Sequence, residues 1–335
     1  MNINDRQTSG NQFMEEGDFE KAIQEYQKAL EVNPNYIPAL SKLAEIYEIQ
    51  KEFSRSLEYN QKIATLRPDR ISAYMKLAKT MTNQGRLEEA SHIYSQVLKK
   101  FPGNLDDVMK SRFARINFLA TLNKSVSYLE IGVCKGVTFT QIALPNKVAV
   151  DPKFQFNYSD YKSEKVEFHE ITSDDFFKLD TDDLFDFIYL DGLHIFEQTF
   201  RDFCSTLSMA HGKTIWLIDD TVPSDRFAAE RSQKECGKLR RAAGHEGSEW
   251  MGDVFKIVYA IHDFFPQFSY ATFPHHGQTV VWRETRKCFK PHLNSLSAIS
   301  NLTFQDFLNT KEAIMNFQKP TEIIALLNDR FKNFI

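Results

Sequence analysis

The chain has few cysteines and no excess of basic residues. Its four cysteines form no C-x-x-C pair and no regular spacing, which excludes a disulfide framework and predicts free thiols in a reducing compartment. They are Cys134, Cys204, Cys236 and Cys288. Forty-one basic residues stand against 45 acidic ones, for a net charge of -4. The chain has no surplus of basic residues to bind nucleic acid and no Lys/Arg-rich amphipathic stretch to bind a membrane. Neither nucleic acid nor a membrane is therefore expected as a partner.

Long apolar runs are missing as well. No stretch approaches the ~20 residues that a membrane-spanning helix needs, and the polar start from Met1 to Arg6 does not resemble a signal peptide. We therefore expect a cytoplasmic protein. With 335 residues, of which 42% are hydrophobic and 26% charged, the chain is long enough for two globular domains, each with its own core.

The first hundred residues repeat with a period of 34. Pro34, Pro68 and Pro102 are 34 residues apart, and the same period aligns small residues with small ones and large apolar residues with large ones. The aligned sets are Gly10/Ala44/Ala78, Phe13/Tyr47/Met81, Ala22/Ser56/Ala90, Tyr26/Asn60/Tyr94 and Ala29/Ile63/Val97. The pattern resembles three tetratricopeptide repeats, which implies an α-helical solenoid over 1–102. The middle copy departs most, with Asn60 in an aromatic position and Lys51 in place of a turn glycine.

Repeat arrays of this kind have a concave face that commonly binds peptides or proteins. We therefore expect a protein partner or a recruited substrate on the concave face of residues 1–102. The alternative is that the array only packs, either on the second domain or on a second copy of the chain in a homodimer.

The remainder of the chain is predicted to be an α/β domain. A helix is expected over Leu105–Lys124, with no Gly/Ser linker before the first strand. Strands are expected at Tyr128–Ile131, Lys147–Val150, Val166–Ile171, Phe185–Leu190 and Lys213–Ile218. Apolar strands that alternate with helices predict a parallel sheet covered on both faces. Phe268–Phe273 and Thr279–Arg283 are expected to close one edge as a β-hairpin, with His275 and His276 in a surface turn at its tip.

These patterns divide the chain into 1–102 for the repeats, 103–126 for a connecting helix, 127–290 for the α/β domain and 291–335 for a helical extension. A further helix is expected over Asp253–Phe265. The stretch from Leu302 to Ile335 is typical of two amphipathic helices broken at Lys319-Pro320. We expect this stretch to have one of three roles: a substrate cap, a surface that packs on the repeats or a dimer contact.

One strand–turn–helix lies at the centre of the α/β domain, in the sequence S-Y-L-E-I-G-V-C-K-G-V-T of residues 127–138. Glu130 precedes a turn that runs from Gly132 to Gly136. Such a turn presents backbone N–H groups at the start of a helix to a nucleotide-like ligand. Asp151 ends the next strand, 19 residues after Gly132, where a carboxylate can accept hydrogen bonds from a ribose diol.

The glycine spacing separates two classes of nucleotide-binding enzyme. A dinucleotide fingerprint, G-x-G-x-x-G, needs glycine where Cys134 stands, so an NAD-dependent oxidoreductase ranks last. The pattern present, E-x-G-x-x-x-G, resembles motif I of the class I S-adenosylmethionine-dependent methyltransferases. The resemblance implies a doubly wound, Rossmann-like sheet with an edge hairpin. It also implies that Glu130, Gly132 and Gly136 hold the methionine end of S-adenosylmethionine and that Asp151 holds its ribose.

Acidic residues follow four of the expected strands. In doubly wound sheets the ligand lies at the carboxyl ends of the strands, so these acids favour a functional site at that edge. The acids are Asp151, Asp174, Asp175, Asp191, Asp219 and Asp220. The resemblance implies that Ser173 and Asp174 hold the adenine, and Ser173 is also a candidate helix N-cap.

Three of these acids form a candidate metal site. Asp191, Asp219 and Asp220 end neighbouring strands and offer the hard oxygen ligands that Mg²⁺ takes. Their arrangement resembles metal-dependent O-methyltransferases, both the catechol type and the sugar-modifying type. The resemblance implies that the metal binds the acceptor hydroxyl, lowers its pKa and positions its oxygen. The alternative is that Asp219-Asp220 only caps a helix, as in metal-free relatives.

His194 is the candidate general base, three residues after Asp191. An imidazole with its ordinary pKa near 6.5 can accept a hydroxyl proton at neutral pH. The alternative is that His194 caps the helix that follows it. Sugar-modifying relatives carry a second acidic residue at the position where this chain has Leu193. The general base of those relatives therefore cannot be assigned to this chain. The charged segment between Thr221 and Trp250 is expected to be a lid over the acceptor or an ordinary surface loop.

The sequence therefore predicts an S-adenosylmethionine-dependent O-methyltransferase, assisted by Mg²⁺, with Asp191 and His194 at the reacting centre. Its acceptor is expected to be a hydroxyl of a sugar, a glycan or a secondary metabolite. Two other classes stay open. One is a protein methyltransferase whose repeats recruit a polypeptide substrate. The other is a non-catalytic interaction protein with a relic α/β domain, which Cys134 in the glycine turn favours.

Overall fold

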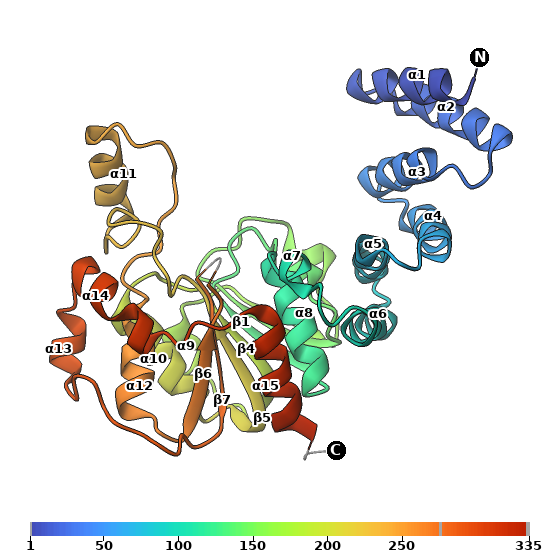
Figure 1. Ribbon diagram of the computed structural model, residues 1–335. Coiled ribbons are helices and arrows are strands. Elements are labelled where there is room, and N and C mark those ends of the chain that lie inside the picture. Colours follow the sequence, from blue (N-terminus) through green and yellow to red (C-terminus); the bar gives the residue numbers. More distant parts are fainter. Residues whose placement is uncertain (1, 275–276, 333–335) are drawn as a thin grey trace. The chain divides into compact units, whose positions relative to one another are not determined.

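The computed structural model describes residues 2–274 and 277–332, so His275 and His276 lie outside the described residues. The chain divides into two compact units, Met1–Asn104 and Leu105–Ile335, which are coloured blue to teal and green to red in Figure 1. Each unit has its own core, as the two predicted domains require.

The first unit is built from pairs of α-helices that stack in sequence order (Figure 1). The helices are α1 (Ile3–Glu15), α2 (Phe19–Val32), α3 (Ile37–Ile49), α4 (Phe53–Leu66), α5 (Ile71–Asn83) and α6 (Leu87–Lys100). The first helices of successive pairs begin 34 residues apart, at Ile3, Ile37 and Ile71. A Cβ atom on Gly10 would lie 2.5 Å from the ring of Tyr26. The small residue thus lets α1 approach α2 closely, which confirms the helical repeat.

The middle repeat accommodates its two unusual residues in different ways. Asn60 is buried, and its side-chain amide donates to Ser56 Oγ at 3.3 Å and Thr80 Oγ1 at 3.0 Å. Polar partners therefore replace the aromatic packing that Tyr26 provides in the first repeat. Lys51 has a φ of 60°, in the left-handed region that costs any residue with a Cβ atom about 1–2 kcal/mol. The corresponding turn residue of the first repeat, Gly17, has a φ of 77°.

The second unit contains one sheet, which in the described residues has seven strands in the order β3-β2-β1-β4-β5-β7-β6. The strands are β1 (Ser127–Ile131), β2 (Asn146–Val150), β3 (Val166–His169), β4 (Phe185–Leu190), β5 (Ala210–Ile218), β6 (Phe268–Thr272) and β7 (Thr279–Arg283). Strands β1 to β5 are parallel, and β7 runs antiparallel to both β5 and β6. This topology confirms the predicted parallel sheet and the hairpin at its edge.

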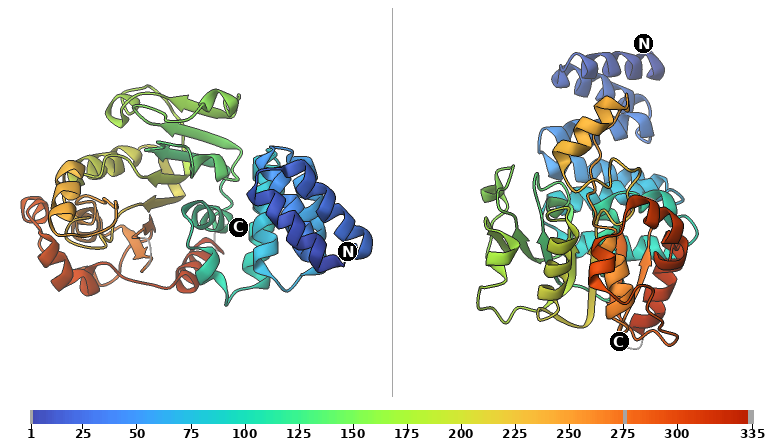
Figure 2. Two further views of the ribbon diagram at one scale, coloured as in Figure 1. Left: turned by 90° about the horizontal axis from the view of Figure 1, so that it is seen from above. Right: turned by 90° about the vertical axis from the view of Figure 1, so that its left-hand side faces the viewer.

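Helices cover both faces of the sheet (Figure 2). On one face α8 (Arg112–Leu122) packs on β5 and on α15 (Pro320–Lys332), which also contacts α7 (Leu105–Val108). On the other face α10 (Phe196–Thr206) packs on β4 and on α12 (Lys256–Phe264), which contacts α13 (Leu296–Ser300) and α14 (Phe304–Ile314). The remaining helices are α9 (Ser173–Phe176), α11 (Gln233–Ala242) and the 3₁₀ helices Phe139–Gln141 and Tyr158–Asp160.

The C-terminal helices belong to this core. Phe307, Ile314 and Met315 are buried in the same hydrophobic cluster as strands β1, β4 and β5. The described side chains of this stretch pack on the α/β unit itself, which is none of the three roles expected for residues 302–335. The expected break between two helices is confirmed, with Pro320 as the first residue of α15, where its missing N–H has no helical partner to lose.

Four local predictions were wrong. The glycine turn after β1 leads to a single 3₁₀ turn, Phe139–Gln141, instead of an α-helix. The run V-T-F-T before and within this turn is β-branched or aromatic and has low helix propensity, and Pro145 follows closely. The connecting helix is two helices, α7 and α8, because the backbone is extended at Ser111. Strand β3 ends at His169 and not at Ile171 as predicted. Helix α12 begins at Lys256 and not at Asp253.

Candidate functional site

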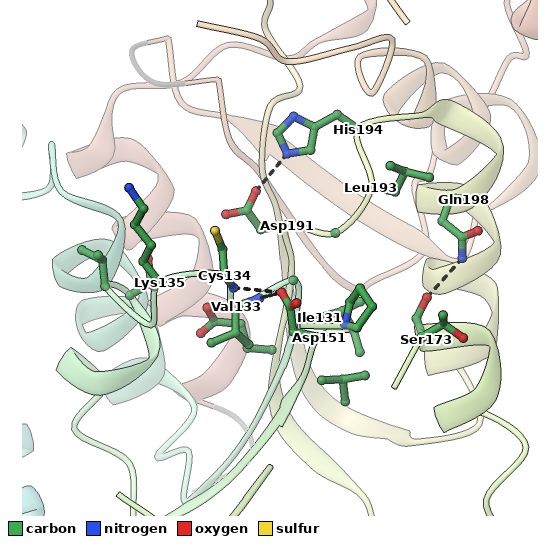
Figure 3. Close-up of a pocket in the computed structure, with 18 of the residues that line it drawn as sticks. Ile131, Val133, Cys134, Lys135, Asp151, Ser173, Asp191, Leu193, His194 and Gln198 are labelled. Atoms are coloured by element: carbon green, nitrogen blue, oxygen red, sulfur yellow. Dashed lines mark hydrogen bonds and ion pairs between the residues drawn. The ribbon is translucent and has the colours of Figure 1, made fainter. Parts of the chain in front are cut away.

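A cavity of about 690 Å³ lies at the carboxyl ends of β1, β2 and β4 (Figure 3). Its volume is in the range of small-molecule sites. Seven residues predicted from sequence line it: Glu130, Gly132, Asp151, Ser173, Asp174, Asp191 and His194. The second turn glycine, Gly136, lies against Phe156, whose ring would be 2.7 Å from a Cβ atom there. Gly136 therefore shapes the turn and is not part of the cavity wall.

Gly132 marks the closest approach between the loops that follow β1 and β4. Its φ is 87°, and a Cβ atom there would lie 2.0 Å from the backbone carbonyl oxygen of Asp191. No side chain fits in that space, so glycine is required for both its conformation and its size. The loop that carries Asp191 is thereby held next to the glycine turn.

Asp151 holds the glycine turn in place. Its Oδ2 atom accepts hydrogen bonds from the backbone N–H groups of Val133 at 2.9 Å and Cys134 at 2.8 Å, and its Oδ1 atom accepts one from Lys153 at 2.8 Å. The sequence predicted that the turn would present its N–H groups to a ligand. Two of them are instead occupied by this carboxylate, because the end of β2 lies directly beside the turn.

Glu130 is buried at the base of the cavity. The hydroxyl of Tyr128 donates a hydrogen bond to Glu130 Oε2 at 2.6 Å. Burial is the main reason why the pKa of Glu130 is well above its usual value. A carboxyl group in such a place favours a ligand atom that carries positive charge or donates a hydrogen bond.

Ser173 and Asp174 lie on the opposite side of the cavity, and a residue that the sequence did not reveal joins them. Gln198 of α10 donates hydrogen bonds to Ser173 Oγ and Asp174 Oδ1, both at 3.1 Å (Figure 3). Ser173 is not the N-cap of α9, because the side chain that accepts from the N–H of Asp175 is that of Thr172. The Ser173 hydroxyl is therefore held by Gln198 at the cavity wall.

The acids that follow β4 and β5 come together with His194, but not in the predicted set. Ligand atoms of Asp191, His194 and Asp220 all lie within 4.8 Å of one another. His194 Nδ1 is 3.0 Å from Asp220 Oδ2, and His194 Nε2 is 3.6 Å from Asp191 Oδ1 (Figure 3). The sequence predicted Asp191, Asp219 and Asp220. Strand β5 ends at Ile218, and Asp220 has a φ of 57°, so the chain turns at this point and the two carboxylates face different partners.

Asp219 faces α8 instead. Its Oδ2 atom accepts a hydrogen bond from Tyr189 at 2.7 Å and lies 2.9 Å from Nε of Arg112. Arg112 also reaches Asp191, with 3.1 Å between Nη1 and Oδ2. Arg112, Gln198 and Trp250 all line the cavity, yet no motif in the sequence pointed to them.

The pKa of His194 is raised in this arrangement. Burial alone would lower its pKa, but the hydrogen bond to Asp191 and the charge of Asp220 outweigh burial and raise the pKa of His194 to about 9. The prediction that His194 has an ordinary pKa near 6.5 and accepts a proton was therefore wrong for this state of the site. His194 is also not a helix cap, because the first N–H of α10, that of Phe196, donates to Asp253 Oδ1 at 2.8 Å.

The segment between Thr221 and Trp250 is ordered and contributes to the cavity. Trp250 stacks on His194 with 4.7 Å between ring centroids and 21° between ring planes. The indole N–H of Trp250 donates to the carbonyl of Glu230 at 2.6 Å, and Arg240 pairs with Asp225 at 3.0 Å. These contacts fix one wall of the cavity next to the acids. Of this segment, Trp250 at its end lines the cavity.

The donor set at Asp191, His194 and Asp220 fits a divalent cation. Two carboxylates and one imidazole are ligands for Mn²⁺ and similar ions, whereas Mg²⁺ prefers oxygen alone. Burial first, and then repulsion by neighbouring carboxylates, raise the pKa of Asp219 to about 6 and the pKa of Asp220 well above its usual value. The Oδ1 atom of Asp219 is buried and has no hydrogen-bond partner among the described residues. Added positive charge would favour the ionised form of these carboxylates.

Comparison with known families assigns the first unit. Residues 10–50 match the family model described as "TPR repeat", and residues 72–104 match "Tetratricopeptide repeat". The N-terminal unit therefore carries tetratricopeptide repeats, as the 34-residue period predicted. No curated protein matches the chain.

Solved structures resemble the same unit. One is the N-terminal domain of stress-induced protein-1 from C. elegans, with 23% identity over 30% of this chain and 84% of that chain and a TM-score of 0.27. Another is the first tetratricopeptide domain of Spaghetti (RPAP3) bound to an HSP90 peptide, with 24% identity, 30% and 81% coverage and a TM-score of 0.28. A third is the first such domain of human RPAP3, with 21% identity, 36% and 95% coverage and a TM-score of 0.30. In the described part of the chain, no helix is long and apolar enough to cross a membrane.

Proposed function

We propose that the α/β unit binds S-adenosylmethionine in the 690 Å³ cavity and transfers its methyl group to a hydroxyl oxygen. The observation that carries the proposal is a convergence: Glu130, Gly132 and Asp151 of the motif and Ser173, Asp174 and Asp191 of the later strand ends all line one cavity. The edge hairpin that the resemblance implies is also present.

In this proposal, each group of cavity residues is assigned to one part of the cofactor. Glu130 and Gly132 are assigned to the methionine end, since a buried carboxyl group favours the ammonium group there. Asp151 is assigned to the ribose, for which Oδ1 retains accepting capacity besides its bond to Lys153. Ser173 and Asp174, held by Gln198, are assigned to the adenine.

The acceptor is assigned to the space beside Asp191, His194 and Trp250. A divalent cation held by Asp191, His194 and Asp220 would supply acidity to the acceptor hydroxyl and orient its oxygen. The indole of Trp250 offers a flat apolar surface that excludes water and suits the face of a sugar ring. In the transfer, the bond from sulfur to methyl breaks as the bond from oxygen to methyl forms. The hydroxyl proton passes to the carboxylate of Asp191, which lines the cavity, because His194, with its pKa raised to about 9, already carries a proton at neutral pH. A sugar, glycan or secondary-metabolite hydroxyl is the proposed acceptor.

Calorimetric titration tests this function. Full-length protein would be titrated with S-adenosylmethionine and S-adenosylhomocysteine, in buffer with MnCl₂, with MgCl₂ and with EDTA, and NAD would serve as the control ligand. Micromolar binding of the two sulfur ligands, with no binding of NAD, is the expected result. A flat trace for every ligand would refute the proposal and favour the α/β unit as a relic in an interaction protein.

The repeats favour a second candidate within the same chemistry. Tetratricopeptide arrays commonly present a concave face to peptides or proteins, so the first unit would recruit either a partner or a polypeptide substrate. The second candidate function is therefore that of a cytoplasmic protein methyltransferase. Radiolabel from S-adenosylmethionine that appears in a co-purified protein, and not in small molecules, would favour it over the sugar acceptor.

A further inference from the structure

Arg112 lies between two carboxylates of the site and differs from both in its exposure. Its Nε atom is 2.9 Å from Asp219 Oδ2, and its Nη1 atom is 3.1 Å from Asp191 Oδ2. The Arg112 side chain is 49% exposed, whereas that of Asp219 is 1% exposed. The guanidinium group can therefore move into the cavity, while the carboxylate that it contacts cannot move out.

Asp191 belongs to the candidate metal site and also pairs with Arg112. Its Oδ2 atom faces Arg112 and lies 3.3 Å from the hydroxyl oxygen of Tyr189, whose proton is donated to Asp219. Its Oδ1 atom faces His194 Nε2 at 3.6 Å. A cation bound by Asp191, His194 and Asp220 would thus depend on a carboxylate whose charge Arg112 already balances.

Arg115 lies on the same helix as Arg112 but has a purely structural role. It is 1% exposed and donates to the backbone carbonyl of Met109 at 3.0 Å and to the side-chain amide of Gln278. Its guanidinium also lies 4.5 Å from the ring centroid of Phe273. Its partners are neutral oxygens and a ring, whereas those of Arg112 are two carboxylates of the site.

We propose that Arg112 is a tethered counter-cation of the acid cluster, which competes with a divalent cation for Asp191 and so sets the metal affinity of the site. This inference rests on the cation site of the proposed function. The competition is electrostatic: a guanidinium about 3 Å from a carboxylate oxygen removes much of the attraction that a second cation would feel there. Before a metal ion can bind, the Arg112 side chain has to move away from Asp191. The half-exposed side chain has room for this movement.

Binding of Mn²⁺ to the full-length protein, followed by the electron paramagnetic resonance signal of the free ion, tests the competition without any turnover. The variants are Arg112→Met, Arg112→Lys and the control Lys135→Met. Lys135 lines the same cavity and loses the same charge, but its side chain is exposed. Arg112→Met is expected to tighten Mn²⁺ binding at least about tenfold, and Lys135→Met by less than about threefold. Arg112→Lys keeps the charge and is expected to stay close to the unmodified protein.

Two outcomes would overturn the proposal. One is an Arg112→Met variant that binds Mn²⁺ no more tightly than Lys135→Met, which would reduce the effect to net charge. The other is the absence of Mn²⁺ binding at millimolar concentration in every variant, which would leave nothing for Arg112 to compete with. Titration of the same preparations with S-adenosylhomocysteine in EDTA judges the methyl-transfer proposal separately, because cofactor binding does not require the cation.

Discussion

The carboxylate of Asp151 accepts a hydrogen bond from the backbone N–H of Cys134 at 2.8 Å. Asp151 thus acts on the glycine turn as well as on the cavity that both residues line. A substitution of Asp151 should consequently affect both the stability of the turn and the affinity for a ligand, and the two effects can be separated by the choice of side chain.

Asp151→Ala should weaken S-adenosylmethionine binding at least about tenfold and lower the free energy of unfolding by about 1–3 kcal/mol, because the N–H groups of Val133 and Cys134 lose their acceptor. Asp151→Asn keeps one accepting oxygen and should lose less stability. Calorimetry and urea unfolding measure the two quantities. Asp175→Asn on the exposed surface of α9 is the control. Unchanged affinity in both Asp151 variants would refute the ribose assignment.

Asp219 and Asp220 should respond differently to replacement by asparagine. Asp220→Asn should weaken Mn²⁺ binding at least about tenfold, because Asp220 belongs to the cluster with Asp191 and His194. Asp219→Asn should leave Mn²⁺ binding within about threefold and lower the free energy of unfolding by at most about 1 kcal/mol, because it weakens the hydrogen bond from Tyr189 while the half-exposed Arg112 keeps Asp191. Metal titration and chemical unfolding of both variants check this. The reverse pattern would restore the ligand set predicted from sequence.

Lys147 should make stability depend on pH. Its Nζ atom donates to the backbone carbonyls of Phe139 and Ile142, at 3.2 and 3.3 Å, and burial lowers the pKa of Lys147 from 10.5 to about 8. Below pH 8 both the folded and the unfolded chain carry the proton, so the cost of burying the charge is fully present. Between pH 8 and 10.5 the unfolded chain binds more protons, so this contribution to stability rises with pH.

Lys147→Met removes that dependence. Relative to the variant, the unmodified protein should gain up to roughly 3 kcal/mol in free energy of unfolding between pH 7 and pH 10.5. Urea unfolding at several pH values measures the difference, and the exposed Lys165→Met serves as the control. Parallel pH curves for Lys147→Met and the unmodified protein would show that folding does not lower the pKa of Lys147.

Lys51→Gly should stabilise the repeat unit by about 1 kcal/mol, because Lys51 has a φ of 60° where glycine has no steric penalty. Gly85 occupies the corresponding turn of the third repeat with a φ of 75°. Gly85→Lys should therefore destabilise the unit by a similar amount. Thermal unfolding of the two variants gives the comparison. A loss of stability in Lys51→Gly would mean that the lysine side chain contributes more than its backbone costs.

Much of the fold was predictable because its signals are local. The 34-residue period predicted helices whose starts at Ile3, Ile37 and Ile71 keep that period. The apolar run Phe185–Leu190 matches β4 residue for residue. Turn geometry was less predictable. Glycines at 132 and 136 indicated the turn after β1, but the β-branched residues that follow prevented the expected α-helix.

The sequence by itself determined the two units, the order of helices and strands, and the edge of the sheet at which the acids gather, since these follow from periodicity and from the direction of parallel strands. Only the tertiary structure decided which side chains meet there. Arg112 reaches Asp191 from 79 positions away in the chain, and Trp250 reaches His194 from 56. The left-handed backbone at Asp220, with a φ of 57°, turned its carboxylate away from that of Asp219. Such contacts depend on how separate elements pack, and no local pattern records that packing.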